Sequence, residues 1–191
     1  QARAGNALGP APVHLTKMSQ DSITNRVAQS ALVTFDLEDL WPSGGLRTLH
    51  LSEIAPEGLL READARSYVR TIKKHTYQNA VLAIEGSEDF IVPQWLGPML
   101  ASSLADSVHF VGFGLPSQVL SAYYAQALAQ LDWTAFKGAR VLLKGCGRHP
   151  VPDTAYAAAS MHLSRVVLKL MYGEACSNVP LFKSEAEGTK P

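Results

Sequence analysis

The sequence predicts an α/β fold with three layers, a largely parallel sheet and an N-terminal β-hairpin at one side of it. The main observation is a unit that occurs three times after Asn79: a short apolar run, then a glycine, then a segment with helical periodicity. Short buried strands that alternate with amphipathic helices are typical of right-handed crossovers between parallel strands. The second observation is a pair of strand-like segments nearer the N-terminus, separated by a turn-like one.

The N-terminal elements follow from local sequence signals. Residues 21–30 are expected to form a short helix, with Asp21 as its N-cap. Residues 31–37 are rich in β-branched and aromatic side chains and predict a strand. Residues 46–51 alternate apolar with polar side chains, and the Trp-Pro-Ser-Gly-Gly turn at 41–45 lies between these two strands. A hairpin is therefore expected here.

Helices and strands alternate in the rest of the domain. Residues 57–75 have the composition of a charged helix. Three repeated units follow, with strands expected at 81–84, 108–111 and 141–143 and helices at about 93–104, 116–131 and 152–171. The last of these helices is predicted from apolar residues at the spacing of one face, namely Tyr156, Ala159, Leu163, Val166, Val167 and Leu170.

Length and composition indicate one compact domain. The chain has 191 residues, of which 47% are hydrophobic and 18% charged, a balance typical of a globular domain with a substantial core. Residues 1–17 are rich in Ala, Gly and Pro without periodicity, so we expect a flexible leader, a single α/β domain over 18–183 and a flexible tail over 184–191.

Charge and hydropathy argue against several classes of protein. Seventeen basic side chains balance 17 acidic ones, so no net field attracts nucleic acid or an anionic membrane. No apolar run approaches the roughly 18 residues that a membrane span requires, and the N-terminus lacks the apolar centre of a secretory signal. Only Cys146 and Cys176 are present, which suits a reducing compartment. We expect a cytoplasmic protein.

The loops after three predicted strands are the expected site. In an open parallel sheet, ligands bind beyond the carboxyl ends of the strands. This rule selects the loops 85–89, 112–114 and 144–149, which should share one rim. The Gly-x-Gly at 112–114 is not followed by the further glycine of a nucleotide-binding fingerprint, and no Gly-x-Ser-x-Gly hydrolase motif occurs. The carboxylates Glu88 and Asp89 are the candidate acid–base groups of this rim.

Cys146 is the most informative residue of these loops. Its thiol lies between two glycines, just before a predicted helix and close to Arg148. Backbone amides, the helix dipole and a nearby cation all favour the thiolate over the thiol. The alternative is that Cys146 is buried as a small hydrophobic residue. Cys176 follows the end of the last predicted helix and lies near Glu174, where negative charge disfavours the thiolate.

A metal site is a second possibility for the same residues. Cys146 and His149 have the Cys-x-x-His spacing that can supply two ligands for zinc or iron. Cys176 or a carboxylate of Glu88, Asp89 or Asp36 could complete it. However, a helix of about 19 residues carries the chain roughly 28 Å from Cys146, and six residues return about 20 Å. The two sulfurs can meet only if that helix is shorter than predicted, or if a second subunit supplies one of them.

The chain resembles a bacterial family of uncharacterised proteins that is classed as a domain of unknown function. The resemblance spans about residues 19–183, and it rests on Leu-Val-Thr-Phe-Asp-Leu-Glu-Asp at 32–39, Ile-Val-Pro at 91–93, Leu-Lys-Gly-Cys at 143–146, Pro-Val-Pro at 150–152 and Met-Tyr-Gly-Glu-Ala-Cys-Ser-Asn-Val-Pro at 171–180. It implies no particular reaction, but it implies an association with proteins of iron–sulfur-cluster assembly. The chain departs from the resemblance at 147–149, which weakens the metal interpretation of His149.

These observations leave three hypotheses about function. The first is a thiol- or metal-using accessory protein of iron–sulfur or sulfur metabolism that acts through Cys146 and Cys176. The second is a non-enzymatic interaction module or homodimeric scaffold, for which a protein partner or a second copy is expected and nucleic acid and membrane are not. The third is a small-molecule enzyme with Glu88 or Asp89 as acid or base, although no paired nucleophile is evident.

Overall fold

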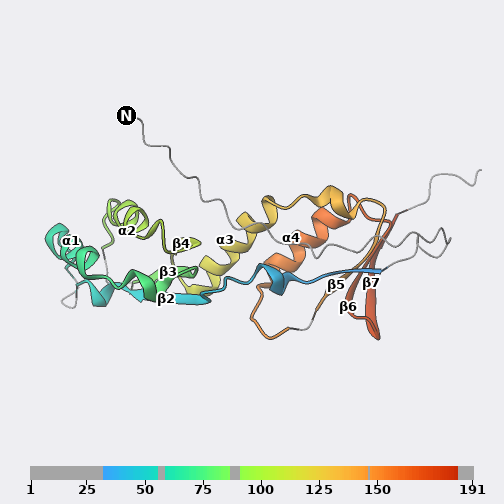
Figure 1. Cartoon of the computed structure of the whole chain (residues 1–191), viewed down its shortest axis with the longest axis horizontal. Helices are drawn as coiled ribbons and strands as arrows, with labels where there is room; N and C mark the ends of the chain where they lie inside the picture. The colour runs from blue at the N-terminus through green and yellow to red at the C-terminus, as the bar shows by residue number, and fades with distance from the viewer. Residues whose placement is uncertain (1–31, 56–58, 87–90, 146, 185–191) are drawn as a thin grey trace, which may run out of the picture.

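The computed structural model describes residues 32–55, 59–86, 91–145 and 147–184 (Figure 1). The predicted α/β fold is confirmed, since helices pack on mostly parallel sheets. The described strands are β1 (Leu32–Phe35), β2 (Leu46–His50), β3 (Val81–Glu85), β4 (Phe110–Phe113), β5 (Arg140–Lys144), β6 (Lys169–Glu174) and β7 (Ser177–Lys183). The α-helices are α1 (Glu62–Thr71), α2 (Leu96–Leu104), α3 (Pro116–Ala129) and α4 (Asp153–Leu163). Short 3₁₀ helices include η2 (Leu37–Leu40) and η5 (Trp133–Phe136).

The strands form two sheets, not the single sheet expected. Sheet A has the order β1-β5-β6-β7, and sheet B has the order β2-β3-β4. All pairs are parallel except β6 with β7. Figure 1 shows sheet B towards one end of the elongated molecule and sheet A towards the other. The chain passes from sheet A to sheet B after β1 and returns to sheet A at β5.

The predicted N-terminal hairpin is wrong. β1 pairs with β5, with Phe35 opposite Leu143, whereas β2 pairs with β3, with Leu46 opposite Val81. The segment 36–45 that joins β1 to β2 contains η2 and is longer than hairpin loops of about two to five residues. Each strand therefore pairs with a buried parallel strand from elsewhere in the chain.

Sheet B has helices on both faces, which agrees with the predicted three layers. In β3, Leu82 and Ile84 belong to the cluster that contains residues of α1 and α2. The alternate residues Val81 and Ala83 pack with Val119 of α3. Because side chains alternate across a strand, burial on both faces requires the continuous apolar run of β3.

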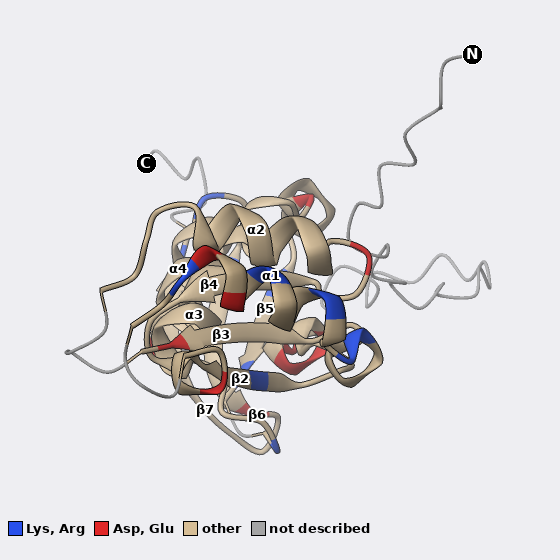
Figure 2. Cartoon of the chain, turned by 90° about the vertical axis from the view of Figure 1, so that its left-hand side faces the viewer, with Lys and Arg blue, Asp and Glu red and all other residues tan. Residues whose placement is uncertain are grey.

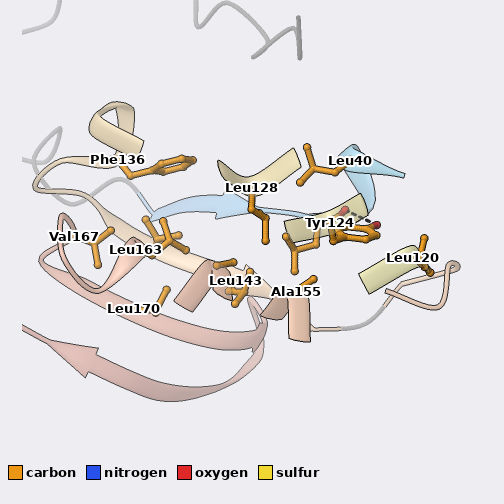
Figure 3. Packing of buried hydrophobic residues seen from close by; sticks show 13 residues of the cluster. Leu40, Leu120, Tyr124, Leu128, Phe136, Leu143, Ala155, Leu163, Val167 and Leu170 are labelled. Carbon is orange, nitrogen blue, oxygen red and sulfur yellow. Dashed lines mark hydrogen bonds between the residues drawn. The ribbon is translucent and has the colours of Figure 1, made fainter. Parts of the chain in front are cut away.

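Sheet A packs against α3 and α4 through the largest apolar cluster of the described residues. This cluster includes Val141 and Leu143 of β5. Figure 3 shows Leu143 close to Leu128 of α3 and Leu163 of α4. The hydroxyl of the fully buried Tyr124 donates a hydrogen bond to the carbonyl of Leu37, with an oxygen–oxygen distance of 3.1 Å. This bond ties η2 to α3, so the residues that follow β1 are held against the core.

The C-terminal elements differ from prediction. The helix expected over 152–171 ends at Leu163, and the last residues of the predicted helix, 169–171, begin the strand β6. The apolar residues Val167 and Leu170 remain buried, but Leu170 is buried in a strand that pairs with β5. An apolar spacing that fits a helix also fits a short turn followed by a buried strand, so periodicity alone could not separate them.

The strand β7 was also absent from the sequence prediction, where its residues form a loop bounded by glycine and proline. β7 is the outer strand of sheet A and pairs antiparallel with β6, with a register shift between Leu170 and Met171. Pro180 lacks a donor for the ladder, and such residues are tolerated in outer strands and at bulges. Glycine and proline are typical of a loop, but both are also compatible with an outer strand.

Several predictions lie outside the described residues. They are the leader over 1–17, the helix over 21–30 and most of the tail, of which Ser184 alone is described. The amide of Ser184 donates to the carbonyl of Leu168 at 2.9 Å, so the ordered sheet extends to the predicted end of the domain. None of the described helices is long and apolar enough to cross a membrane.

Candidate functional site

The carboxyl edge of sheet A gathers most of the polar side chains singled out by the sequence. β1, β5 and β6 are parallel neighbours, so the residues that follow them leave the sheet at the same edge. Asp36 follows β1, and Lys144 and Glu174 are the last residues of β5 and β6. We call this edge the sheet A rim, defined by the described residues 36–41, 144–145, 147–149 and 172–176.

The prediction that three loops share one rim is wrong in part. The residues after β3 and β4 do share an edge, since Ile84 lies opposite Phe113 in neighbouring parallel strands. The loop at 144–149 follows a strand of the other sheet. Glu88 and Asp89 lie outside the described residues, in the segment that follows β3 of sheet B.

An ion pair lies at the centre of the sheet A rim. The Nζ of Lys144 is 2.5 Å from Oδ2 of Asp36, and the two side chains are 31% and 20% exposed. The other carboxylate oxygen of Asp36 accepts the amide of Glu38 at 2.9 Å and caps η2. The hydrogen bond and charge of Asp36 raise the pKa of Lys144, and the charges of Glu38 and Glu174 contribute in the same direction. Lys144 is therefore held protonated.

Carboxylates outnumber cations around this pair. Burial is the main cause that raises the pKa of Asp39, and the negative charges of Asp36 and Glu38 add to it, while Lys144 lowers it. One lysine therefore faces several carboxylates. The sequence indicated Asp36 as a possible metal ligand and Lys144 as part of a candidate loop, but it did not predict their contact, because 108 positions separate the two residues.

The segment that follows Cys146 is anchored on η2. A carboxylate oxygen of Glu38 accepts the backbone amide of His149. The indole of Trp41 stacks on the His149 ring, with centroids 4.5 Å apart and planes inclined by 6°. A Cβ at Gly147 would overlap with the Glu38 carboxylate, so a side chain there would displace that carboxylate from its contact with His149. Arg148 is exposed beside these contacts.

The two cysteines belong to loops that follow neighbouring strands. Cys146 lies outside the described residues, but Gly145 and Gly147 on either side of it are described. Lys144 lies opposite Gly173, and the amide of Gly145 donates to the carbonyl of Gly173 at 3.3 Å. Cys176 is exposed and free in the turn between β6 and β7. The predicted separation by a long helix is wrong, because α4 has 11 residues and β6 returns to the same edge.

A metal site among the described side chains is not found. No group of three or more His, Cys, Asp or Glu residues within 32–55, 59–86, 91–145 and 147–184 could hold a metal ion. The predicted set includes Cys146, which is outside those ranges, so it stays a prediction. The stack on Trp41 and the contact of Glu38 do fix the position of His149, the second residue of that set.

A cavity of about 350 Å³ adjoins the rim. It lies between the first turns of α3 and α4 and the start of β2, where Ser117, Leu120, Pro150, Pro152 and Leu46 line it. The Pro150 and Pro152 side of the cavity directly follows His149 in the chain. Pockets of this size can take a small molecule.

Asp39→Asn is expected to raise the free energy of unfolding at pH 7 by roughly a few tenths of a kcal/mol, since the side chain is largely exposed. The folded state raises the pKa of Asp39 above its ordinary 3.8, so stability falls as the pH rises from 3.8 through the raised value. Urea unfolding should show the gain at pH 7 and none at pH 3.

Asp132→Ala is the control, because this substitution is expected to lower the free energy of unfolding at pH 7. The hydroxyl of Thr134 donates to Asp132 at 2.6 Å and its amide donates at 3.0 Å. These bonds lower the pKa of Asp132, so its stabilising contribution is present at pH 7 and is lost as the pH falls below 3.8. A gain in stability from Asp132→Ala at pH 7, or a loss from Asp39→Asn, would contradict this account.

Comparison with known proteins identifies a family without identifying an activity. No curated protein and no solved structure matches the chain. A family model described as "Protein of unknown function (DUF2480)" matches residues 21–184, which includes every described strand and helix. The chain therefore belongs to the DUF2480 family of proteins of unknown function.

Proposed function

We propose that the sheet A rim is a thiol- or metal-using site and that the protein is an accessory factor of iron–sulfur or sulfur metabolism. The observation that supports this most is the register of β5 and β6, in which Lys144 lies opposite Gly173. Cys146 follows Lys144 by two residues and Cys176 follows Gly173 by three. Neighbouring parallel strands thus end side by side shortly before each cysteine in the sequence, which supports a shared site.

The surroundings of the two thiols differ in charge. Cys146 lies two residues before Arg148 and seven before Asp153, the N-terminus of α4, where backbone donors and the helix dipole favour a thiolate. Cys176 follows Glu174, whose charge also acts on Lys144. We infer that Cys146 is the nucleophile or first metal ligand and that Cys176 is its partner.

Zinc or iron fits the donor types of this proposal. Two thiolates and the imidazole of His149 are the soft and borderline ligands that both metals accept. The ion would supply either a structural cross-link between the loops or an open position for a sulfur ligand. Lys144 and Asp36 satisfy each other at 2.5 Å, so Asp36 is not assigned as a ligand.

Alkylation rates test the thiol assignment. We expect Cys146, measured alone in Cys176→Ser, to react faster between pH 6 and 8 than Cys176, measured alone in Cys146→Ser. A thiol of ordinary pKa, about 8.5, is mostly protonated over this range. If Cys146 reacts no faster than a model thiol, the site is not a thiol-activating one and the proposal fails in that form.

Metal analysis tests the other form of the proposal. Protein purified without an affinity tag should contain zinc or iron, and both Cys146→Ser and Cys176→Ser should lose it. Asp132→Ala, a substitution at the N-cap of η5 and outside the rim residues, is the control and should retain the metal. Metal-free wild type together with unreactive thiols would favour the alternative of a non-enzymatic interaction module or homodimeric scaffold.

A further inference from the structure

One continuous part of the chain is almost without charge. Between Ile91 and Leu131, Asp106 is the only Asp, Glu, Lys or Arg, although 18% of the whole chain is charged. This segment contains α2, β4 and α3. Depletion of charged residues is the compositional mark of a protein–protein interface, more than hydrophobicity itself.

The three elements form one side of sheet B. β4 is an outer strand in the order β2-β3-β4, and both α2 and α3 contact it. α2 belongs to the cluster on one face of β3, and α3 packs on the other face. Figure 1 shows β4 beside both helices, and in Figure 2 α2 carries neither charge colour. The surface is therefore a strand edge with an uncharged helix on either side.

Exposed apolar side chains gather at the carboxyl end of this edge. Phe113, the last residue of β4, is 44% exposed, and Leu115, two residues later, is 52% exposed. Ile91 and Trp95, just before α2, are 87% and 36% exposed. The first turn of α2 touches Phe113, since a Cβ on Gly97 would lie 3.0 Å from its ring. Exposed apolar side chains on neighbouring elements are typical of an interaction surface.

β4 also lacks the features that usually protect an outer strand. β7, the outer strand of sheet A, has Pro180, Lys183 and a register shift, each of which discourages pairing with another strand. β2 carries Arg47. The sequence of β4, Phe-Val-Gly-Phe, has no charge and no proline, so its edge is open to a further strand.

We infer that α2, β4 and α3 form the contact surface with a second copy of this chain, with β4 pairing antiparallel to its counterpart across a two-fold axis. Across such an axis the same surface meets itself, and residues close to the axis lie near their own copies, so a surface of one charge sign would repel itself and an uncharged one would not. Sheet B then continues from one copy into the other. The inference deepens the homodimer alternative and involves no residue of the sheet A rim.

The mass of the protein in solution tests this inference. Light scattering of the full chain under reducing conditions, at about 100 µM, should give twice the chain mass of 20.6 kDa. Phe113→Glu and Leu115→Glu each introduce a charge into the apolar contact surface, where it would be buried without a partner of opposite charge, and should each give the monomer mass. Met161→Glu, at a 61% exposed position on α4, is the matched control and should remain a dimer.

Hydrogen exchange supplies a second readout that needs no variant. The amides of residues 110–113 in the wild type should exchange more slowly at 100 µM than at about 1 µM, while those of β7 should not change. A monomeric wild type at the higher concentration would overturn the inference. So would a dimer that survives both substitutions, or β4 exchange that is independent of concentration. Failure here leaves the thiol tests unaffected, since they read alkylation and metal content.

Discussion

Gly173→Ala should lower the free energy of unfolding by about 3 kcal/mol. Gly173 has a φ of +127°, where a side chain strains the backbone. A Cβ at this position would also lie 2.6 Å from the carbonyl oxygen of Ser177, a backbone atom of β7 that cannot rotate away. The backbone strain and the collision both destabilise the pairing of β6 with β7, whose connecting turn contains Cys176.

Gly138→Ala provides the matched control. Gly138 also has a positive φ, +71°, but a Cβ there meets nothing within 4 Å. It should therefore cost about 1 kcal/mol from the backbone alone, and the difference between the two variants measures the collision with β7. If urea unfolding shows the same decrease in the free energy of unfolding for both variants, the β6–β7 turn can shift to accommodate the added Cβ at little energetic cost.

Leu143→Ala should destabilise the protein by about 3 kcal/mol, within the range of buried leucine truncations. The Leu143 side chain is fully buried, and Figure 3 shows it among Leu128, Ala155 and Leu163. Residues on three elements meet here, so the cavity left by alanine cannot close by moving one side chain. Leu143 directly precedes Lys144 in β5, so the packing of Leu143 also supports the backbone at Lys144.

Leu168→Ala is the control for Leu143→Ala. Leu168 is 48% exposed in the turn before β6, and surface truncations usually change stability by less than about 0.5 kcal/mol. Denaturant titration of the two variants gives the comparison directly. A loss at Leu143 no greater than at Leu168 would mean that the cluster of sheet A contributes little to stability.

The sequence predicted the elements whose signals are local. β3 and β5 are buried apolar runs followed by glycine, and both occur within two residues of their predicted positions. Pro116 marks the start of α3 as expected, because proline suits a first helical turn. These features depend on neighbours in the chain, so periodicity and turn chemistry are sufficient.

The partners of the strands were not predictable in the same way. β1 and β2 have ordinary strand sequences, and nothing in residues 32–50 encodes that one pairs with Leu143 and the other with Val81. The end of α4 carries neither glycine nor proline between Leu163 and Lys169, so no stop signal separated it from β6. Tertiary packing decided both outcomes.

In the candidate site, too, local features could be predicted from the sequence and long-range contacts could not. The glycines around Cys146 pointed to a loop of interest from sequence alone. The contacts of Asp36 with Lys144 and of Glu38 with His149 join residues more than 100 positions apart, and only the pairing of β1 with β5 brings them together. A long-range contact of this kind leaves no spacing pattern in the sequence.

The pairing of β1 with β5 also bears on the order in which the chain folds during its synthesis. Sheet B uses strands that lie between residues 46 and 113, so it can form while the ribosome is still adding later residues. β1 is made first but has no neighbour until residues 140–143 emerge. Closing so long a loop is slow and leaves an apolar strand unpaired in the meantime. We therefore expect the nascent chain to depend on chaperones until β5 is complete.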